Sequence, residues 1–251
     1  MTDKNIKKGQ SRREQILSNA EKLFCQNGYD NTTVEMIVEG LGCSKGSFYH
    51  HFSGKSEVLQ EISVNNLKKS LSAYNAKMYA DNIAKLNALL YYTSPFQESN
   101  SDFLAVIMSL ILKKEFADIF FSISAERKRL FYPEFYAILN MIRNEQKAFW
   151  RIESLPELLW DAHAGFTASC IMEVLKSFKS DEDIQGLLYD KLAAARFIWQ
   201  RTLDLPYGAV YIIRLEELVK AFKSSYNKLG SMFAPYGLEV QTVMRSVKNA
   251  Q

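Results

Sequence analysis

The stretch from Ser11 to Leu59 constrains the fold more than any other part of the sequence. Apolar residues recur there at the i, i+4, i+7, i+8 spacing of a helix: Ile16, Ala20, Leu23 and Phe24. Thr32 and Glu35 form a capping-box pattern that starts a second helix with Thr32 as its cap, and Ser44 is placed to cap a third. The pattern predicts three short helices, followed by the start of a fourth near Lys55.

The predicted third helix has an unusual outward face. Phe48 and Phe52 lie one turn apart and are expected to face the core. The residues left outside are Lys45, Ser47, Tyr49 and His50. Gly46 costs about 1 kcal/mol relative to alanine inside a helix, a cost that makes sense if the helix must approach another surface closely. With a tight turn at Gly42 before it, this is the layout of a helix-turn-helix that reads DNA.

The bulk composition predicts a cytoplasmic globular protein. The net charge of +3 is too small to indicate nucleic-acid binding by itself, but basic residues gather at the front of the chain. Residues 1–10 are expected to form a flexible basic arm that contacts phosphates or enters a minor groove, the alternative being a solvated tail. Three cysteines without CxxC spacing favour a reducing compartment. The sequence has no signal-peptide pattern and no apolar run long enough for a membrane span.

The rest of the chain predicts an all-α fold. A long helix from Lys55 to about Tyr79 is expected to join the first three helices rigidly to the body, because no Gly/Ser linker separates them. Further helices are predicted over residues 84–93, 101–114, a segment ending near 147 and kinked at Pro133, 155–178, 183–203 and 209–229, with a shorter one after Pro235. The predicted domains are residues 11–57, which read DNA, and 58–251, which bind ligand and dimerise.

Residues 11–59 resemble the N-terminal DNA-binding domain of the TetR family of bacterial transcriptional regulators. The resemblance is carried by the F-x-x-x-G-Y pattern at Phe24–Tyr29, by Thr32–Val34, Ile37 and Gly42, and by the run S-K-G-x-x-Y-x-H-F-x-x-K from Ser44 to Lys55. It covers roughly the first quarter of the chain, and the segment beyond about Pro206 looks like an extension of the usual length.

The resemblance implies a homodimer that inserts two recognition helices into successive major grooves of a palindromic DNA operator and that a small ligand controls. Lys45, Ser47, Tyr49 and His50 would face the groove, with Gly46 permitting close approach. Phosphate contacts would come from Thr33, Ser44, Tyr49 and Lys55. A repressor is the expected form. A transcriptional activator or a ligand-independent DNA-binding protein of the same fold is the alternative.

A dense set of aromatic residues between Tyr91 and Met172 predicts a cavity for a hydrophobic or aromatic effector of unknown identity. The candidate lining residues are Phe103, Phe120, Phe135, Trp160, His163 and Phe166. The competing interpretation places any one of them in an ordinary core. No metal and no cofactor are predicted, since His163 has no ligand partner at i+4. A helical enzyme is a remote alternative, because no catalytic motif appears.

Helices 155–178 and 183–203 combine small and large apolar residues, and in the TetR family the equivalent pair forms a four-helix dimer interface. Their candidate interface residues are Trp160, Ala164, Thr167, Ala168, Ile171, Leu175, Leu187, Leu188, Ala194, Ala195 and Ile198. Packing inside one subunit is an equal alternative. Cys43 lies in the turn before the reading helix, where oxidation could disturb DNA binding, although a small buried residue is the simpler interpretation.

Overall fold

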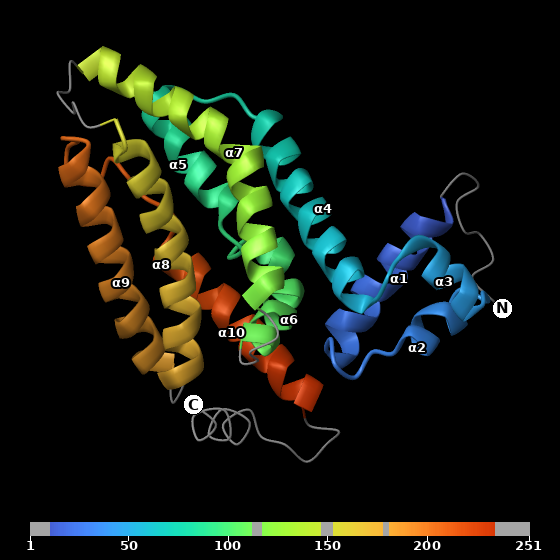
Figure 1. The fold of residues 1–251 in the computed structure, drawn as a ribbon. Coiled ribbons are helices and arrows are strands. Elements are labelled where there is room, and N and C mark those ends of the chain that lie inside the picture. Colours follow the sequence, from blue (N-terminus) through green and yellow to red (C-terminus); the bar gives the residue numbers. More distant parts are fainter. Residues whose placement is uncertain (1–10, 112–116, 147–152, 178–180, 234–251) are drawn as a thin grey trace.

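The computed structural model describes residues 11–111, 117–146, 153–177 and 181–233. Within those ranges the chain forms α-helices and one short 3-10 helix, with no strand (Figure 1). The predicted all-α class is therefore confirmed. The helix predicted after Pro235 and the arm predicted over residues 1–10 lie outside the described residues.

Helices α1 (Arg12–Asn27), α2 (Val34–Glu39) and α3 (Lys45–His51) form a small unit at one end of the molecule (Figure 1). The Ser11 hydroxyl accepts the Glu14 N–H, and the Glu14 carboxylate accepts the Ser11 N–H in return, so a complete capping box starts α1. Ser44 caps α3 as predicted. These capping bonds join residues only three apart, so the sequence is enough to predict where these helices begin.

The prediction that Thr32 caps the second helix is wrong by one residue. Thr33 is the N-cap of α2, and its hydroxyl accepts the Met36 N–H at 3.2 Å. Thr32 is fully buried and donates its hydroxyl to the Gly28 carbonyl at 2.8 Å. Thr32 thereby satisfies a carbonyl left unpaired where α1 ends, and the next residue is left to cap α2.

Helix α4 (Lys55–Asn75) runs from this unit into the body, where it packs against α5 and α7. It ends at Asn75 and not near Tyr79 as predicted. The Tyr79 hydroxyl donates to the Tyr74 carbonyl at 2.7 Å, and the two rings stack 5.2 Å apart. Tyr79 therefore folds back to satisfy a carbonyl of the last turn, as other C-terminal caps do.

The body consists of six further α-helices in the described ranges, which share one continuous core with the first four. They are α5 (Asn82–Thr93), α6 (Ser101–Ile111), α7 (Ala117–Gln146), α8 (Leu155–Ser177), α9 (Asp181–Thr202) and α10 (Leu215–Phe233), with the 3-10 helix η1 (Glu98–Asn100) before α6. Pro133 lies inside α7, which changes direction part-way along in Figure 1, as predicted from the missing backbone N–H. No described helix is long and apolar enough to cross a membrane.

Residues 203–214 do not form the helix predicted to start at Ala209. They run as turns and extended backbone, and α10 begins only at Leu215. Val210, Ile212 and Ile213 are buried in this segment. Side chains from other elements replace the missing helical bonds: Gln200 donates to the Val210 carbonyl at 3.3 Å and Arg196 to that of Ile213 at 2.9 Å. The segment can therefore bury its backbone without helical bonds.

Asn87 is the residue that fixes this segment on the body. Its amide donates to the Ala209 carbonyl at 2.8 Å and accepts the Tyr211 N–H at 2.9 Å, while the side chain itself is buried. Asn87→Ala is expected to lower the free energy of unfolding by about 1.5 kcal/mol, because two backbone groups lose their partner. Urea denaturation measures this. Asn227→Ala, at an exposed position on α10, is the control, and equal stability of both variants would contradict the role of Asn87.

Candidate nucleic-acid interface and interior cavity

The outward face of α3 has the exposure that the sequence predicts. Phe48 and Phe52 are buried, whereas Lys45, Gly46 and His50 are exposed. Tyr49 keeps 57% of its surface open to solvent, a large value for an aromatic residue on a helix. Ser47 is the exception to this prediction because it is half-buried; its backbone N–H donates to the capping hydroxyl of Ser44 at 3.2 Å. The face is thus short, polar and centred on an exposed aromatic ring.

Gly46 is not required by packing within the protein. A Cβ placed there would meet only the Ser44 hydroxyl, at 3.6 Å, which is ordinary contact. The φ angle of Gly46 is not positive either, so neither packing nor backbone conformation requires a glycine at this position. The absence of a side chain at this position therefore favours close approach by a partner from outside.

Lys45 joins α3 to α2 through an ion pair with Glu35. The bond to Lys45 lowers the pKa of the Glu35 carboxyl and raises that of the lysine. Both side chains are more than half exposed, so the pair is screened by water and adds little to stability. What the pair does is hold the Lys45 ammonium beside the outward face of α3.

Lys55, at the start of α4, forms hydrogen bonds within the unit of α1–α3. Its ammonium donates to the carbonyls of Tyr29 at 2.9 Å and Thr32 at 2.7 Å, and it lies 4.5 Å from the centre of the Tyr29 ring. A third carbonyl, that of Asp30, lies 3.5 Å away. These bonds tie α4 to the loop between α1 and α2. The phosphate contact predicted for Lys55 stays a prediction, as do those of Thr33 and Ser44, whose hydroxyls accept bonds as helix caps.

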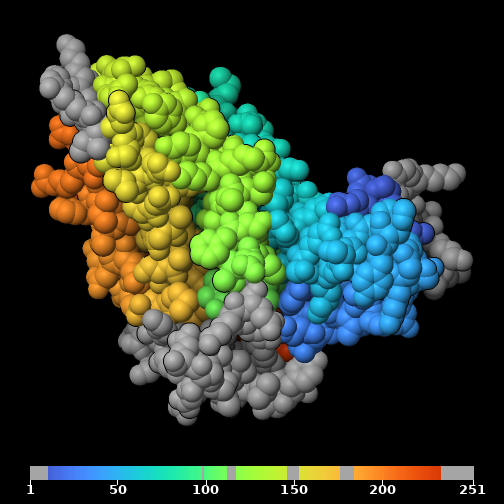
Figure 2. All heavy atoms as spheres, in the orientation of Figure 1, coloured from blue at the N-terminus to red at the C-terminus, as the bar shows by residue number. Residues whose placement is uncertain are grey.

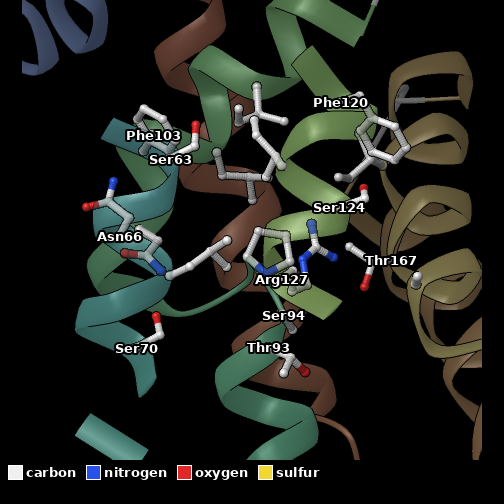
Figure 3. Close-up of a pocket in the computed structure, with 18 of the residues that line it drawn as sticks. Ser63, Asn66, Ser70, Thr93, Ser94, Phe103, Phe120, Ser124, Arg127 and Thr167 are labelled. Atoms are coloured by element: carbon white, nitrogen blue, oxygen red, sulfur yellow. The ribbon is translucent and has the colours of Figure 1, made fainter. Parts of the chain in front are cut away.

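An interior cavity of about 100 Å³ lies between α4, α5, α6, α7 and α8 (Figure 3). Such a volume has room for several water molecules. Two of the predicted aromatic residues, Phe103 and Phe120, line it. The rest of the wall combines aliphatic side chains with polar groups from α4, the end of α5, η1, α7 and α8.

The other four predicted lining residues do not line this cavity. Phe135 and Trp160 pack edge to face in the core, with ring centres 5.4 Å apart, and Trp199 lies 5.8 Å from Phe135. His163 and Phe166 are buried residues of α8 that do not line the cavity. Helical periodicity does not separate aromatic residues that face a cavity from those that fill a core, because both faces are apolar.

His163 lies behind the cavity wall and is neutral. Its Nε2 is 2.9 Å from the hydroxyl of Thr93, which does line the cavity. Because the Thr93 hydroxyl donates to carbonyls one turn back on α5, it accepts from the imidazole, and Nδ1 is left as a buried atom without a hydrogen-bond partner. Burial and, next, the charge of Arg127 lower the pKa of His163 to about 3.

Sequence reasoning missed the polar part of the wall, chiefly Arg127 and Asn66. Arg127 belongs to the run Glu126–Leu130, which has the charged composition of a solvated helix face. No sequence signal distinguishes it from Arg129, which is exposed and bonded to Glu126. Among the described residues no cluster of potential metal ligands is found.

The cysteines offer no reactive thiol in the interior. Burial raises the pKa of Cys25 and Cys170 to about 12, so both thiols stay protonated at neutral pH. Cys43 is half-buried and free. Its predicted sensitivity to oxidation stays a prediction.

Helices α2 and α3, joined by a tight turn and presenting Tyr49, Lys45 and Gly46 outward, define the helix-turn-helix class of DNA-binding domain. Residues 16–62 match the family model of bacterial regulatory proteins of the tetR family. Residues 16–62 therefore form a DNA-binding domain of the kind found in TetR-family transcriptional regulators, and the resemblance predicted for this part of the chain is confirmed.

Individual relatives agree with this assignment. The regulator AcrR of Shigella flexneri is 32% identical over 95 residues, which make up 37% of this chain and 44% of AcrR. The chain therefore spans less than half the length of that relative. FadR from Bacillus subtilis, in complex with stearoyl-CoA, has a similar structure with a TM-score of 0.53 at 18% identity, covering 72% of this chain and 96% of FadR. GusR of Salmonella enterica gives a TM-score of 0.55 at 14% identity, covering 80% and 99%. At 18% and 14% identity, the likeness to these two structures establishes the fold alone. AcrR and FadR are both transcriptional regulators.

Proposed function

We propose that this chain is a cytoplasmic repressor that binds a palindromic operator as a homodimer and leaves it when a small, largely apolar molecule fills the cavity. The observation that carries the proposal is the position of α4. This helix begins at the DNA-binding domain, and its residues Ser63, Asn66, Leu67 and Ser70 line the cavity. One rigid element therefore joins the two sites.

Asn66 provides a direct connection between them. Its side chain lines the cavity, and its amide donates to the Glu21 carboxylate of α1 at 2.9 Å. Helix α1 also packs against α6, which supplies another part of the cavity wall through Phe103 and Ile107. A ligand that separates α4 from α6 would therefore shift α1, and with it α3, relative to the body. Differential affinity for the two arrangements is what such a switch requires.

The proposed dimer face is the outer side of α8 and α9. In Figures 1 and 2 these helices lie on the side of the body away from α1–α3. Their exposed large apolar residues are Leu158, Met172, Tyr189, Phe197 and Ile198. Only Ile198 of these stands in the predicted interface set. Trp160, Ile171, Leu175, Leu188 and Ala195 are buried within the subunit, and Ala164, Thr167 and Ala168 line the cavity. The core alternative therefore holds for most of that set, while the exposed patch supports a partner on the opposite face.

Selection of bound sequences from a pool of random duplexes tests the proposal. The expected product is an inverted repeat whose half-sites are separated by about one helical turn, since two copies of α3 must enter successive grooves. Sedimentation of the free protein should give a dimer. A monomer, or enrichment of a single half-site, would contradict the operator model. Transcription from a template that carries the selected site distinguishes repression from activation.

Tyr49→Ala is expected to weaken binding to the selected operator about tenfold, because the exposed aromatic side chain of the reading helix is removed. Fluorescence anisotropy at fixed salt measures the affinity, since phosphate contacts make binding salt-dependent. The matched control is Tyr207→Ala, which removes a fully exposed tyrosine from the loop before α10. Equal affinity of the two variants would show that α3 does not read the DNA.

A further inference from the structure

Arg127 on α7 is a half-buried charged side chain whose Nε atom is enclosed beside the cavity. It lines the cavity, and it is the one charged residue among the described lining residues. Its Nε atom is enclosed and has no hydrogen-bond partner, and no ion pair or hydrogen bond of the guanidinium occurs among the described residues. Figure 3 shows Arg127 among the side chains that line the cavity, where Ser94 and Ser124 are also lining residues.

Arg129, two residues further along, behaves as an ordinary surface arginine. It is exposed, and both its Nε and one terminal nitrogen donate to Glu126, at 3.0 and 2.7 Å. The same sequence run therefore contains one arginine with its counter-charge and one without. A buried ion without a partner is unfavourable, and burial lowers the pKa of Arg127 accordingly.

Nothing in the cavity wall offsets this charge. The described lining residues include no aspartate or glutamate. His163, the other ionisable group nearby, is neutral, and its Nδ1 also lacks a partner. The hydroxyls of Ser63, Thr93 and Thr167 donate to carbonyls of their own helices. The hydroxyl of Ser94 accepts the Phe96 N–H and keeps its own hydrogen to donate.

We infer that the cavity takes an amphipathic organic anion, a carboxylate on an apolar body. The carboxylate lies on the guanidinium of Arg127, with the Ser94 and Ser124 hydroxyls as further donors. The apolar body lies against Phe103, Ile107 and Phe120. A planar guanidinium binds a carboxylate with two parallel bonds, which gives orientation as well as affinity. This inference rests on the proposed function, because it names the chemical class of the effector.

Calorimetry on the full chain tests the class of ligand with matched pairs. The probes are octanoate and 1-octanol, 4-phenylbutyrate and 4-phenyl-1-butanol, and indole-3-acetate and indole-3-ethanol. At least one carboxylate should bind at least about tenfold more tightly than its alcohol. Arg127→Met should abolish that preference, and Arg129→Met should keep it. Binding of no carboxylate, equal binding of acid and alcohol, or an unchanged preference in Arg127→Met would overturn the inference.

Thermal unfolding of the ligand-free chain gives a second readout that needs no ligand. Arg127→Met should raise the midpoint by at least about 2 °C, because an uncompensated charge leaves the interior, whereas Arg129→Met should leave it unchanged. A lower midpoint for Arg127→Met would show that Arg127 stabilises the fold, and would overturn the inference. Calorimetric binding of sulfate that is as tight as that of the best carboxylate and is lost in Arg127→Met would show an inorganic anion site only, which also overturns the inference.

The DNA selection described above keeps the two proposals apart. If an operator is selected but no carboxylate binds, the inference on the ligand fails and the regulator stands. If a carboxylate binds through Arg127 but no operator is selected, the proposed function fails and the assignment of the cavity stands.

Discussion

Lys55→Met is expected to lower the free energy of unfolding of the DNA-binding domain by about 3 kcal/mol, because hydrogen bonds from a charged donor each contribute about 1.5–3 kcal/mol. The ammonium donates to the carbonyls of Tyr29 and Thr32 and lies over the Tyr29 ring. Methionine keeps most of the side-chain length but leaves these carbonyls unpaired. Amide hydrogen exchange in α1–α4 of the full chain measures the loss locally, and operator affinity should fall with it.

Lys45→Met is the matched control, since it removes an exposed lysine of the same domain whose one ion pair among the described residues is with Glu35. It should leave hydrogen exchange close to that of the unmodified chain while weakening operator binding, because Lys45 lies on the reading face. Unchanged exchange in Lys55→Met, together with weaker DNA binding, would contradict the structural role. It would instead support the phosphate contact predicted for that residue.

Acidification from pH 6.5 to 4.5 is expected to lower the free energy of unfolding by about 2 kcal/mol through His163 alone, at 1.36 kcal/mol per pKa unit. The folded pKa of His163 is lowered from 6.5 to about 3 by burial and by the charge of Arg127. As the pH falls below 6.5, the unfolded chain therefore takes up a proton that the folded chain does not. Stability is fully present above that value and is lost as the pH falls towards 3.

Urea denaturation as a function of pH measures this effect against two variants. His163→Gln should flatten the dependence between pH 6.5 and 4.5, since glutamine does not ionise there. His50→Gln, on the exposed face of α3, should retain the dependence of the unmodified chain. If His163→Gln and the unmodified chain lose stability in parallel, the imidazole is accessible to protons in the folded state, and the buried position assigned to it is wrong.

The DNA-binding domain was predictable because the interactions that define it are short in sequence. Ser11 caps α1 through Glu14, and Ser44 caps α3 through Ser47, each over three residues. The positions of Phe48 and Phe52, one turn apart, predict the buried face of α3 and leave Tyr49 on the exposed face. The single error, at Thr32, arose because two adjacent threonines can each cap a helix. The inward position of Thr32 depends on the carbonyls of Leu23 and Gly28, to which its hydroxyl donates.

The sequence predicts that a cavity exists, but it does not predict which residues line that cavity. Phe103 and Phe120 line it, whereas Phe135 and Trp160 lie in the core. All four occupy apolar faces of helices. Which of these faces meets a cavity depends on how the helices pack, and periodicity carries no information on that.

The sequence by itself determined the helical class, the ends of most helices and the reading face of α3, because capping bonds and helical periodicity act over a few residues. Tertiary structure alone decided that residues 203–214 are not helical, since the partners of that segment include Asn87, which lies 122 and 124 residues away in sequence from the groups it binds. It also decided that Arg127 faces the interior and Arg129 the solvent. Burial of a charge depends on the neighbouring helices, and no local pattern encodes them.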